Sequence, residues 1–499
     1  MKISRRTLLA GTAAAALAGK SSFAVAASPP GDVVGKVTVG YQGWFACSGD
    51  GAPINGWWHW SHNWSQPPSP TNTAIVSWPD VRDFTSTYAT AYPNLGNGQT
   101  AQVFSSYDQQ TVNTHFRWMQ QYGCDTAALQ RFNPTGGEGP TRDAMAAKVR
   151  QAAEQYGRKF YIMYDATGWT SMQSEMKADW VGKMRAYTAS PAYARQNGKP
   201  VVCIWGFGFN EPNKTWPADV CLDVVNWFKD QGCYVIGGVP THWRVGNEDS
   251  RPGYLGVYHA FDMLSPWMVG RISDLAGADH YYNNVNQQDQ ADCTAHGIDY
   301  QPCVIPGDLQ SGHRRHGELM WRQFYNLTRV GVQGLYISMF DEFNEGNQIA
   351  KTAETAAWVP AGSGIRALDE DGTACSADYY LRLTNDGGRM FKRQTPLTPT
   401  RPTIPMPAPA AGVVFYEHVD YGGAAGAALA KGSYTRAQLQ AAGVPDNWAS
   451  SVRVPAGWTV TVYAEDNFGG QSWVRTADTP NFVALSPNAN DQLTSCRIA

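Results

Sequence analysis

The stretch of sequence that decides the fold covers residues 332–346 and reads VQGLYISMFDEFNEG. Its first part, Val332–Phe340, is a short apolar run, and three carboxylates follow it at Asp341, Glu342 and Glu345. A run of this length between turn residues is typical of a strand buried in a parallel sheet. The polar residues of such sheets gather where the strands end, so this stretch predicts an active site directly after a strand.

The same pattern recurs along the preceding three hundred residues, where short apolar runs alternate with amphipathic stretches. The expected strands are Val37–Phe45, Thr126–Phe132, Lys159–Asp165, Pro200–Phe207, Tyr234–Val239, Phe261–Val269, Tyr300–Ile305 and Val332–Phe340. The expected helices are Thr111–Tyr122, Thr141–Tyr156, Met176–Tyr187, Val220–Gln231, His316–Val330 and Ala377–Phe391. Eight strands alternating with helices predict an α/β protein with a (β/α)8 TIM barrel. A doubly wound open sheet is the alternative, but no Gly-rich phosphate loop follows an early strand.

The chain divides into four parts. Residues 1–27 resemble a Tat-like signal peptide, with paired Arg5-Arg6, a weakly apolar run and an Ala24-Val25-Ala26 cleavage pattern; an ordinary Sec signal is the alternative. The barrel is expected over residues 34–393. A linker rich in Pro and Thr follows over 394–411, and a small tail occupies 412–499. The protein is therefore expected to be exported from a bacterial cell, to the periplasm or the medium.

Composition narrows the class of protein. The 499 residues are 43% hydrophobic and 16% charged, with a formal net charge of −3 and no long run of one sign. A nucleic-acid partner would need a basic patch, so none is expected. After the signal peptide no stretch reaches the ~20 apolar residues that span a membrane. The 19 Trp and 24 Tyr suit a sugar ligand, since indole faces stack on sugar rings, although aromatic residues also fill large cores.

The chain has nine cysteines and no CxxC pair, which argues against a zinc cluster. Cys293 and Cys303 stand ten residues apart in a loop-like stretch and are the pair expected to form a disulfide outside the cytoplasm. Cys203 and Cys233 lie in apolar runs and are expected to be buried thiols.

The acidic segment favours acid–base chemistry. Like charges this close together repel and raise at least one pKa, which suits one acid and one base. If the segment turns helically, Glu342 and Glu345 lie about 5–6 Å apart at Cβ. This spacing is compatible with the two carboxylates of retaining glycosidases, about 5–5.5 Å apart. The alternative is a solvated acidic turn.

Polar and aromatic residues after the other strands form a candidate substrate-binding set. A dense aromatic loop after the first strand, Trp57–Trp60 with Trp64, suggests a sugar platform, or else a loop that buries its own tryptophans. The set is Tyr41, Trp44, His59, Trp60, Asp165, His242 and Trp267.

The acidic segment resembles a known signature. The pattern E-x-x-E-G in Glu342–Gly346 is similar to that of glycoside hydrolase family 99, which holds endo-acting α-mannosidases and mannanases; family 71 α-1,3-glucanases are related. Tyr41–Phe45, Phe104–Asp108 and His115–Gly123 support the resemblance. It implies a retaining endo-glycosidase in which Glu342 acts as base on the sugar 2-hydroxyl and Glu345 as acid/base. The family usually has Trp and His between the two Glu; this chain has Phe343-Asn344.

A rival interpretation uses the segment Asn210-Glu211-Pro212 after the fourth expected strand. It resembles the acid/base of the large clan of retaining β-glycosidases, with Glu342 as the nucleophile. That clan places its nucleophile after strand seven, whereas Glu342 follows the eighth expected strand. Glu211 as an ordinary loop residue is the simpler alternative.

The tail repeats itself. Tyr416-x4-Tyr421-x-Gly423 is echoed by Tyr463-x4-Phe468-x-Gly470, and DNWASS at 446–451 is echoed by NDQLTS at 490–495. Both copies match the [ND][ND]xx[ST]S signature of βγ-crystallin domains, which are all-β Greek-key structures. The resemblance implies structural calcium, a cation that takes about six to eight oxygen ligands. The expected side-chain ligands are Asn447, Ser450, Asp491 and Thr494; the alternative is that these residues only cap turns.

Two functions of different classes follow. The first is a secreted glycoside hydrolase that acts on a polysaccharide or glycan and needs no cofactor for catalysis. The second is a non-catalytic carbohydrate-binding surface protein with a retired barrel. Two clashing carboxylates favour the first, because a site that only binds does not need them.

Overall fold

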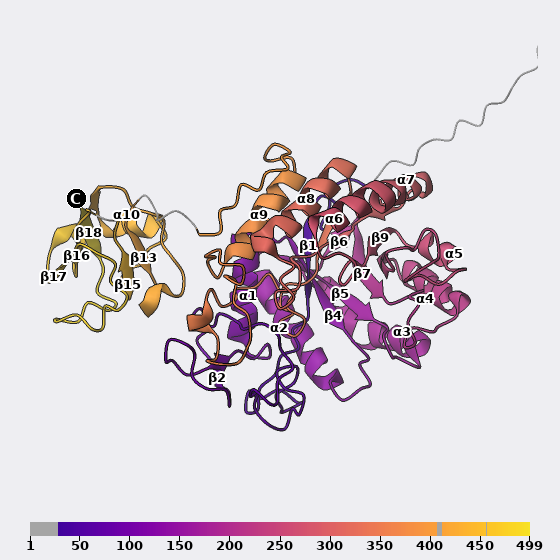
Figure 1. Ribbon diagram of the computed structural model, residues 1–499, viewed down its shortest axis with the longest axis horizontal. Coiled ribbons are helices and arrows are strands. Elements are labelled where there is room, and N and C mark those ends of the chain that lie inside the picture. Colours follow the sequence, from indigo (N-terminus) through magenta and orange to yellow (C-terminus); the bar gives the residue numbers. More distant parts are fainter. Residues whose placement is uncertain (1–27, 407–411, 456) are drawn as a thin grey trace, which may run out of the picture.

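The computed structural model describes residues 28–406, 412–455 and 457–499 (Figure 1). The expected signal peptide lies outside the described residues, as do residues 407–411 of the expected linker. Two separate hydrophobic cores are present, one below residue 392 and one above residue 412. In the described ranges, no helix combines the length and the apolar character that crossing a bilayer requires.

The larger core is built on a parallel sheet that closes on itself. The neighbours run β10–β9–β8–β7–β5–β4–β1–β12–β11, with every pair parallel. Only Gln301 and Pro302 separate β10 from β11, so one segment borders β9 on one side and β12 on the other. The strands are β1 (Val37–Tyr41), β4 (Thr126–Arg131), β5 (Lys159–Asp165), β7 (Lys199–Trp205), β8 (Tyr234–Val239), β9 (Met263–Pro266), β10 (Asp299–Tyr300) with β11 (Cys303–Val304), and β12 (Leu335–Ile337). Together with their helices, these parallel strands fit the expected α/β barrel.

The helices surround the sheet (Figure 1). They are α1 (Gln109–Gln121), α2 (Gly139–Tyr156), α3 (Met172–Gly182), α4 (Ala218–Asp230), α5 (Leu255–Tyr258), α6 (Leu275–Tyr281), α7 (Gln287–His296), α8 (Glu318–Val330) and α9 (Tyr379–Phe391). The six expected helices are present. The structure adds the short helix α5 and the helices α6 and α7, which are joined by the π-helical turn η2 (Tyr282–Asn286). Helix α7 lacks an apolar period and buries only Asp289 and Cys293, which is why its sequence suggested a loop.

The expected disulfide is wrong. Cys293 lies on α7 and Cys303 lies in β11, and all nine cysteines, each within the described residues, are free and buried. Cys203 on β7 and Cys233 before β8 are buried thiols, as expected.

The side chains of β1 alternate between two layers. Thr38 accepts a hydrogen bond from the side chain of Gln301, and Gly40 faces Tyr336 and Met339 in the barrel interior. Tyr41 instead points outward, and its hydroxyl lies 3.0 Å from Nδ1 of His115 on α1. Because strand side chains alternate with period two, the next inward position after Gly40 is residue 42.

A long excursion between β1 and α1 covers one end of the barrel. It holds the aromatic loop and the short hairpin β2 (Tyr88–Ala89) and β3 (Gln102–Val103), and its indigo loops gather below the barrel in Figure 1. The backbone amides of Val76 and Ser77 both donate to the carbonyl of Phe343, 3.1 and 3.3 Å away. The excursion is thus bound to the acidic segment after β12.

The tail is β-rich and small. Its elements are β13 (Val414–Tyr416), β14 (Gly432–Tyr434), α10 (Arg436–Ala441), β15 (Ser451–Arg453), β16 (Val460–Tyr463), β17 (Ser472–Arg475) and β18 (Ser495–Ile498). Strand β13 pairs with β15, and β14–β18–β16–β17 form a second antiparallel sheet. The two Tyr/Phe corners have the same geometry, with ring centroids 5.7 and 5.9 Å apart and interplanar angles of 73° and 71°.

The described part of the linker lies against the barrel helices. The indole of Trp321 on α8 donates to the carbonyl of Thr398, and Arg401 pairs with Glu318 at 3.0 Å. The hydroxyl of Thr403 donates to Asp386 on α9 at 2.6 Å. These contacts fasten residues 398–405 to α8 and α9.

Candidate active site

Asp341 binds the first and last strands of the barrel together. Its carboxylate has no exposed surface and accepts hydrogen bonds from the backbone amides of Gln42 and Gly43, at 2.8 and 2.9 Å. Burial raises the pKa of Asp341 to about 6, against the two amide donors that lower it. Asp341 therefore fixes the loop after β1 against the segment after β12.

Glu342 follows Asp341 and is almost completely buried, with 4% of its surface exposed. The side-chain amide of Gln42 donates to Oε1 of Glu342 at 2.9 Å, while Oε2 has no hydrogen-bond partner in the protein. Burial, followed by repulsion from Glu345, raises the pKa of Glu342 well above its ordinary value. One oxygen is thus held and the other is free to take a proton.

Glu345 is exposed to solvent. Desolvation at the site, followed by repulsion from Asp308, raises the pKa of Glu345 above its ordinary value. The charge of Glu345 contributes to the raised pKa of Glu342, so the two carboxylates interact electrostatically. A buried carboxylate beside an accessible one, each with a raised pKa, is the arrangement that acid–base catalysis needs.

The segment between the two glutamates is a turn and not a helix. The amide of Phe343 donates to the carbonyl of Asp341 at 3.1 Å, and the amide of Asn347 donates to that of Glu342 at 3.3 Å. The helical geometry considered from sequence is therefore not formed. Phe343 is buried against Trp60 and Phe104, and this packing holds the turn.

An aromatic stack lies beside these carboxylates. The indole of Trp44 stacks on the ring of His59 at 3.7 Å and 16°, and on Phe132 at 5.6 Å. The guanidinium of Arg142 lies 4.8 Å from the Phe132 ring, donates to the carbonyl of Gln42 at 2.6 Å, and keeps one nitrogen without a partner. Burial, followed by the Arg142 charge, lowers the pKa of His59 well below its ordinary value, so the ring is neutral.

Unpartnered polar atoms mark this side of the site. The indole nitrogen of Trp44, Nε2 of His59 and the amide oxygen of Asn344 are buried without hydrogen-bond partners. Buried polar atoms are nearly always paired, so exceptions at a strand end indicate places for ligand hydroxyls.

A second group lies at the ends of β5, β7 and β9. Burial raises the pKa of Asp165, the last residue of β5, against the charge of Lys214. The ammonium of Lys214 is 4.8 Å from the centre of the Trp205 ring, and Trp205 meets Trp267 edge to face at 5.3 Å. Lys214 also pairs with Glu211.

Two loops of the tail lie side by side. The amide of Asn447 donates to the carbonyl of Leu493 at 3.0 Å, and the amide of Asp491 donates to that of Ala449 at 3.1 Å. Thr494 donates to the side-chain oxygen of Asn447 at 3.3 Å. Asn447 and Asp491 have φ of 51° and 52°, a left-handed conformation that Asn and Asp tolerate.

These loops leave oxygens unsatisfied. Oδ1 of Asp446 and Oδ1 of Asn490, equivalent positions of the two loops, are buried without a hydrogen-bond partner. Ser450 and Thr494 are 7% and 6% exposed. A set of oxygens that lacks donors fits a hard cation such as Ca²⁺.

The barrel shares its fold with a GH99 endo-α-mannosidase. The structure of that protein from Bacteroides thetaiotaomicron is 14% identical and covers 73% of this chain and 100% of its own, with a TM-score of 0.51. A second structure, of the same enzyme with BIS-TRIS-propane, is 15% identical with the same TM-score, over 72% and 98% of the two chains.

Other comparisons match shorter parts of the chain. A βγ-crystallin domain from Clostridium beijerinckii is 48% identical over 17% of this chain and 95% of its own, with a TM-score of 0.16. The curated "Development-specific protein S" of Myxococcus xanthus is 39% identical over 62 residues, 12% of this chain. The chain spans only 36% of the length of that relative. No protein-family model matches the chain.

Two residues expected to contact substrate lie elsewhere in the GH99-like barrel. Tyr41 has no exposed surface and packs between β1 and α1, because it occupies an outward position of the strand. Trp60 is also fully buried, and its indole donates to the carbonyl of Phe104 at 3.0 Å. Trp60 anchors the aromatic loop, and neither residue offers a surface to a ligand in this structure.

The other expected binding residues lie at or just after the ends of strands, except His59, which lies in the long loop after β1. Trp44, His59, Asp165 and Trp267 belong to the two groups described above. His242 lies after β8, and its Nδ1 is 3.0 Å from Asp249, whose other oxygen accepts from Arg271.

Three residues of the candidate site were missed from the sequence: Gln42, Arg142 and Lys214. Gln42 could have been found from the sequence, because it continues the two-residue alternation of Thr38 and Gly40, which face the barrel interior. Arg142 on α2 and Lys214 in the loop before α4 carried no comparable signal, because only the fold brings them to the strand ends.

Proposed function

We propose that this protein is a glycoside hydrolase that cleaves within a poly- or oligosaccharide with retention of configuration. The observation that carries the proposal is the pair after β12: Glu342, buried with one free oxygen, and Glu345, exposed nearby, with raised pKa values. The barrel fold shared with the GH99 structures supports the same function.

Glu342 acts as the base and Glu345 as the acid. Glu342 takes the proton of the sugar 2-hydroxyl through its free oxygen, and the 2-oxygen attacks the anomeric carbon while the glycosidic bond breaks. Glu345 gives its proton to the leaving oxygen. It then takes a proton from the water that opens the intermediate, and Glu342 returns its proton to the 2-oxygen, which restores both groups.

The aromatic stack and the Asp165 group bind the sugar units on either side. The indole of Trp44 presents a face to a sugar ring, and its N–H and His59 meet hydroxyls. Asp165 and Trp267 serve the next unit, while His242 is held by Asp249 at the edge. The GH99 neighbours are named endo-α-mannosidases, so α-mannans are the first substrates to test.

The test is release of new reducing ends from α-mannans, α-1,3-glucan, xylan, arabinan and β-glucans. Glu342→Gln and Glu345→Gln should each lower release from one α-linked polymer at least ~10³-fold, since each removes one catalytic group. Glu154→Gln, at an exposed position of α2, is the matched control and should retain activity. If neither glutamate variant loses activity, the assignment is wrong.

Two alternatives give other outcomes. Release from a β-linked polymer that depends on Glu211 would favour the β-glycosidase reading, but Glu342 follows the eighth barrel strand and Glu211 is tied to Lys214. Binding to a glycan without release from any polymer would favour a non-catalytic protein.

We further propose that the tail is a βγ-crystallin-like domain that binds structural calcium through Asn447, Ser450, Asp491 and Thr494. The unpartnered oxygens of Asp446 and Asn490 support this proposal. The sequence of residues 1–27 supports export, so the enzyme meets its substrate, and calcium, outside the cytoplasm.

A further inference from the structure

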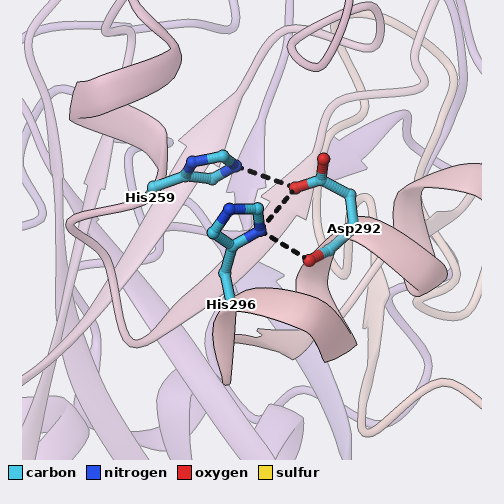
Figure 2. A group of neighbouring side chains, drawn as sticks. All are labelled: His259, Asp292 and His296. Atoms are coloured by element: carbon cyan, nitrogen blue, oxygen red, sulfur yellow. Dashed lines mark hydrogen bonds and ion pairs between the residues drawn. The ribbon is translucent and has the colours of Figure 1, made fainter. Parts of the chain in front are cut away.

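A second cluster of chemically capable side chains lies far from the glutamates. It consists of His259, at the end of α5, with Asp292 and His296 on α7 (Figure 2). His259 precedes the first residue of β9 by four positions, and His296 precedes β10 by three. The cluster therefore lies where strands begin, at the opposite end of the barrel from the acidic segment, which follows β12.

The three side chains converge on one point. Nε2 of His259 is 2.8 Å from Oδ1 of Asp292, and Nδ1 of His296 is 3.2 Å from the same oxygen. The ligand atoms of all three residues lie within 4.8 Å of one another. Figure 2 shows both rings directed at the carboxylate from one side.

These distances are close to those of a metal site. In a tetrahedral zinc site with bonds of 2.0–2.1 Å, ligand atoms lie roughly 3.3–3.4 Å apart. The two nitrogen–oxygen distances, 2.8 and 3.2 Å, therefore need to widen by only a few tenths of an ångström to admit an ion. The two imidazoles are stacked at 3.7 Å and 23°, so they must also open, because each nitrogen binds an ion in its ring plane.

The cluster can make this adjustment. His296 is 43% exposed at its side chain, whereas those of His259 and Asp292 are 20% and 24% exposed. Nδ1 of His296 also lies 2.9 Å from the backbone carbonyl oxygen of Asp292, so this ring must give up that contact to bind an ion. Its exposure allows it to turn, while the other two side chains hold their places. Three protein ligands leave a fourth position to water, on the side open to solvent.

We propose that His259, Asp292 and His296 bind one late first-row divalent cation, with Zn²⁺ as the type ion. Two imidazole nitrogens and one carboxylate oxygen suit zinc, cobalt or nickel, whereas Ca²⁺ and Mg²⁺ prefer all-oxygen sites. The ion joins the α5–β9 connection to α7 and stabilises that end of the barrel. It takes no part in the reaction at Glu342 and Glu345.

The test is a titration of tag-free, chelator-treated full-length protein with Zn²⁺ by calorimetry, in saturating Ca²⁺ to fill the tail. Co²⁺ followed by visible absorption reports the coordination. We expect one tight Zn²⁺ per chain, a tetrahedral Co²⁺ spectrum and a rise of several degrees in melting temperature.

Two variants decide the matter. His296→Ala, at the most exposed ligand, should weaken Zn²⁺ binding at least tenfold and abolish both the spectrum and the thermal shift. His280→Ala is the matched control, since His280 is also exposed on a helix, four residues from an amide, Asn284, instead of a carboxylate. Unchanged Zn²⁺ affinity in His296→Ala, or no binding by the wild-type protein at millimolar Zn²⁺, would overturn the proposal.

Discussion

The side-chain amide of Gln42 donates a hydrogen bond of 2.9 Å to Oε1 of Glu342, so the residue after β1 holds the carboxylate after β12. Asp341 strengthens the same junction through the backbone amides of Gln42 and Gly43. The barrel closes at this junction, because β1 and β12 are neighbours in the sheet. The position of the proposed base therefore depends on barrel closure itself.

Replacement of Gln42 should reveal this dependence. Gln42→Met keeps the length of the side chain and removes the donor, a charged hydrogen bond of about 1.5–3 kcal/mol. We expect kcat to fall about 10- to 100-fold. The hydrogen bond lowers the pKa of Glu342, so its loss should also move the acidic limb of the kcat/KM profile to higher pH.

The matched control is Gln130→Met, an inward residue of β4 whose side chain touches Met339 and not Glu342. It should leave the pH profile in place. An unshifted acidic limb in Gln42→Met would contradict the role given to Gln42, whatever the loss of rate.

Aryl glycosides with good leaving groups should separate the roles of the two glutamates. A dinitrophenolate departs without a proton, so Glu345→Gln should cleave such a substrate at a rate near that of the wild type in its first step. Glu342→Gln should remain inactive, because the base is needed with any leaving group. Stopped-flow release of dinitrophenol measures both, and equal losses in the two variants would remove the assignment of acid and base.

The fold was predictable because the spacing of hydrophobic residues along the sequence follows the secondary structure directly. Runs such as Lys159–Asp165 and Tyr234–Val239 match β5 and β8 at both ends. The catalytic candidates were predictable for a related reason, since they stand in the sequence directly after a strand. Helix α7 was missed because its buried positions are an aspartate and a cysteine, which carry no apolar period.

The binding residues were harder to predict, and β1 shows why. Tyr41 is the last residue of the strand and aromatic, yet alternation turns it toward α1, and the plainer Gln42 receives the inward position. Trp60 and Trp64 belong to one loop, but Trp60 is fully buried while Trp64 is 43% exposed. Only tertiary packing decides which indole anchors such a loop and which remains free.

The buried carboxyl group of Asp289 should make the free energy of unfolding of the barrel depend measurably on pH. It is 1% exposed and accepts from the indole of Trp243 and from Arg244, both at 3.0 Å. Burial raises the pKa of Asp289 from an unfolded value near 4 to about 7. The folded state thus binds the proton more tightly than the unfolded state does. The contribution of Asp289 to the free energy of unfolding is therefore fully present below about pH 4, and it is lost as the pH rises through 7.

Urea unfolding of the wild type and of Asp289→Asn at several pH values checks this sign. The stability of the wild type relative to the variant should fall by up to about 4 kcal/mol between pH 4 and pH 8, because three pKa units are involved. A relative stability that rises with pH over this range would show that Asp289 is ionised in the folded protein.

Calcium should stabilise the tail and leave the chemistry of the barrel unchanged. The paired loops cross through the amides of Asn447 and Asp491, and they leave side-chain oxygens of Asp446 and Asn490 without donors. Because Ca²⁺ binds oxygens that are brought together only in the folded tail, saturating Ca²⁺ should raise the melting temperature of the tail by several degrees.

The double variant Asn447→Ala with Asp491→Ala should abolish this thermal shift and the calorimetric Ca²⁺ signal. The control is Asp478→Asn, which changes a surface carboxylate paired with Arg453 and should keep both. Reducing-end release by the barrel should be equal with Ca²⁺ and with chelator at a temperature at which both units are folded. A double variant that binds Ca²⁺ as the wild type does would exclude these loops as the site.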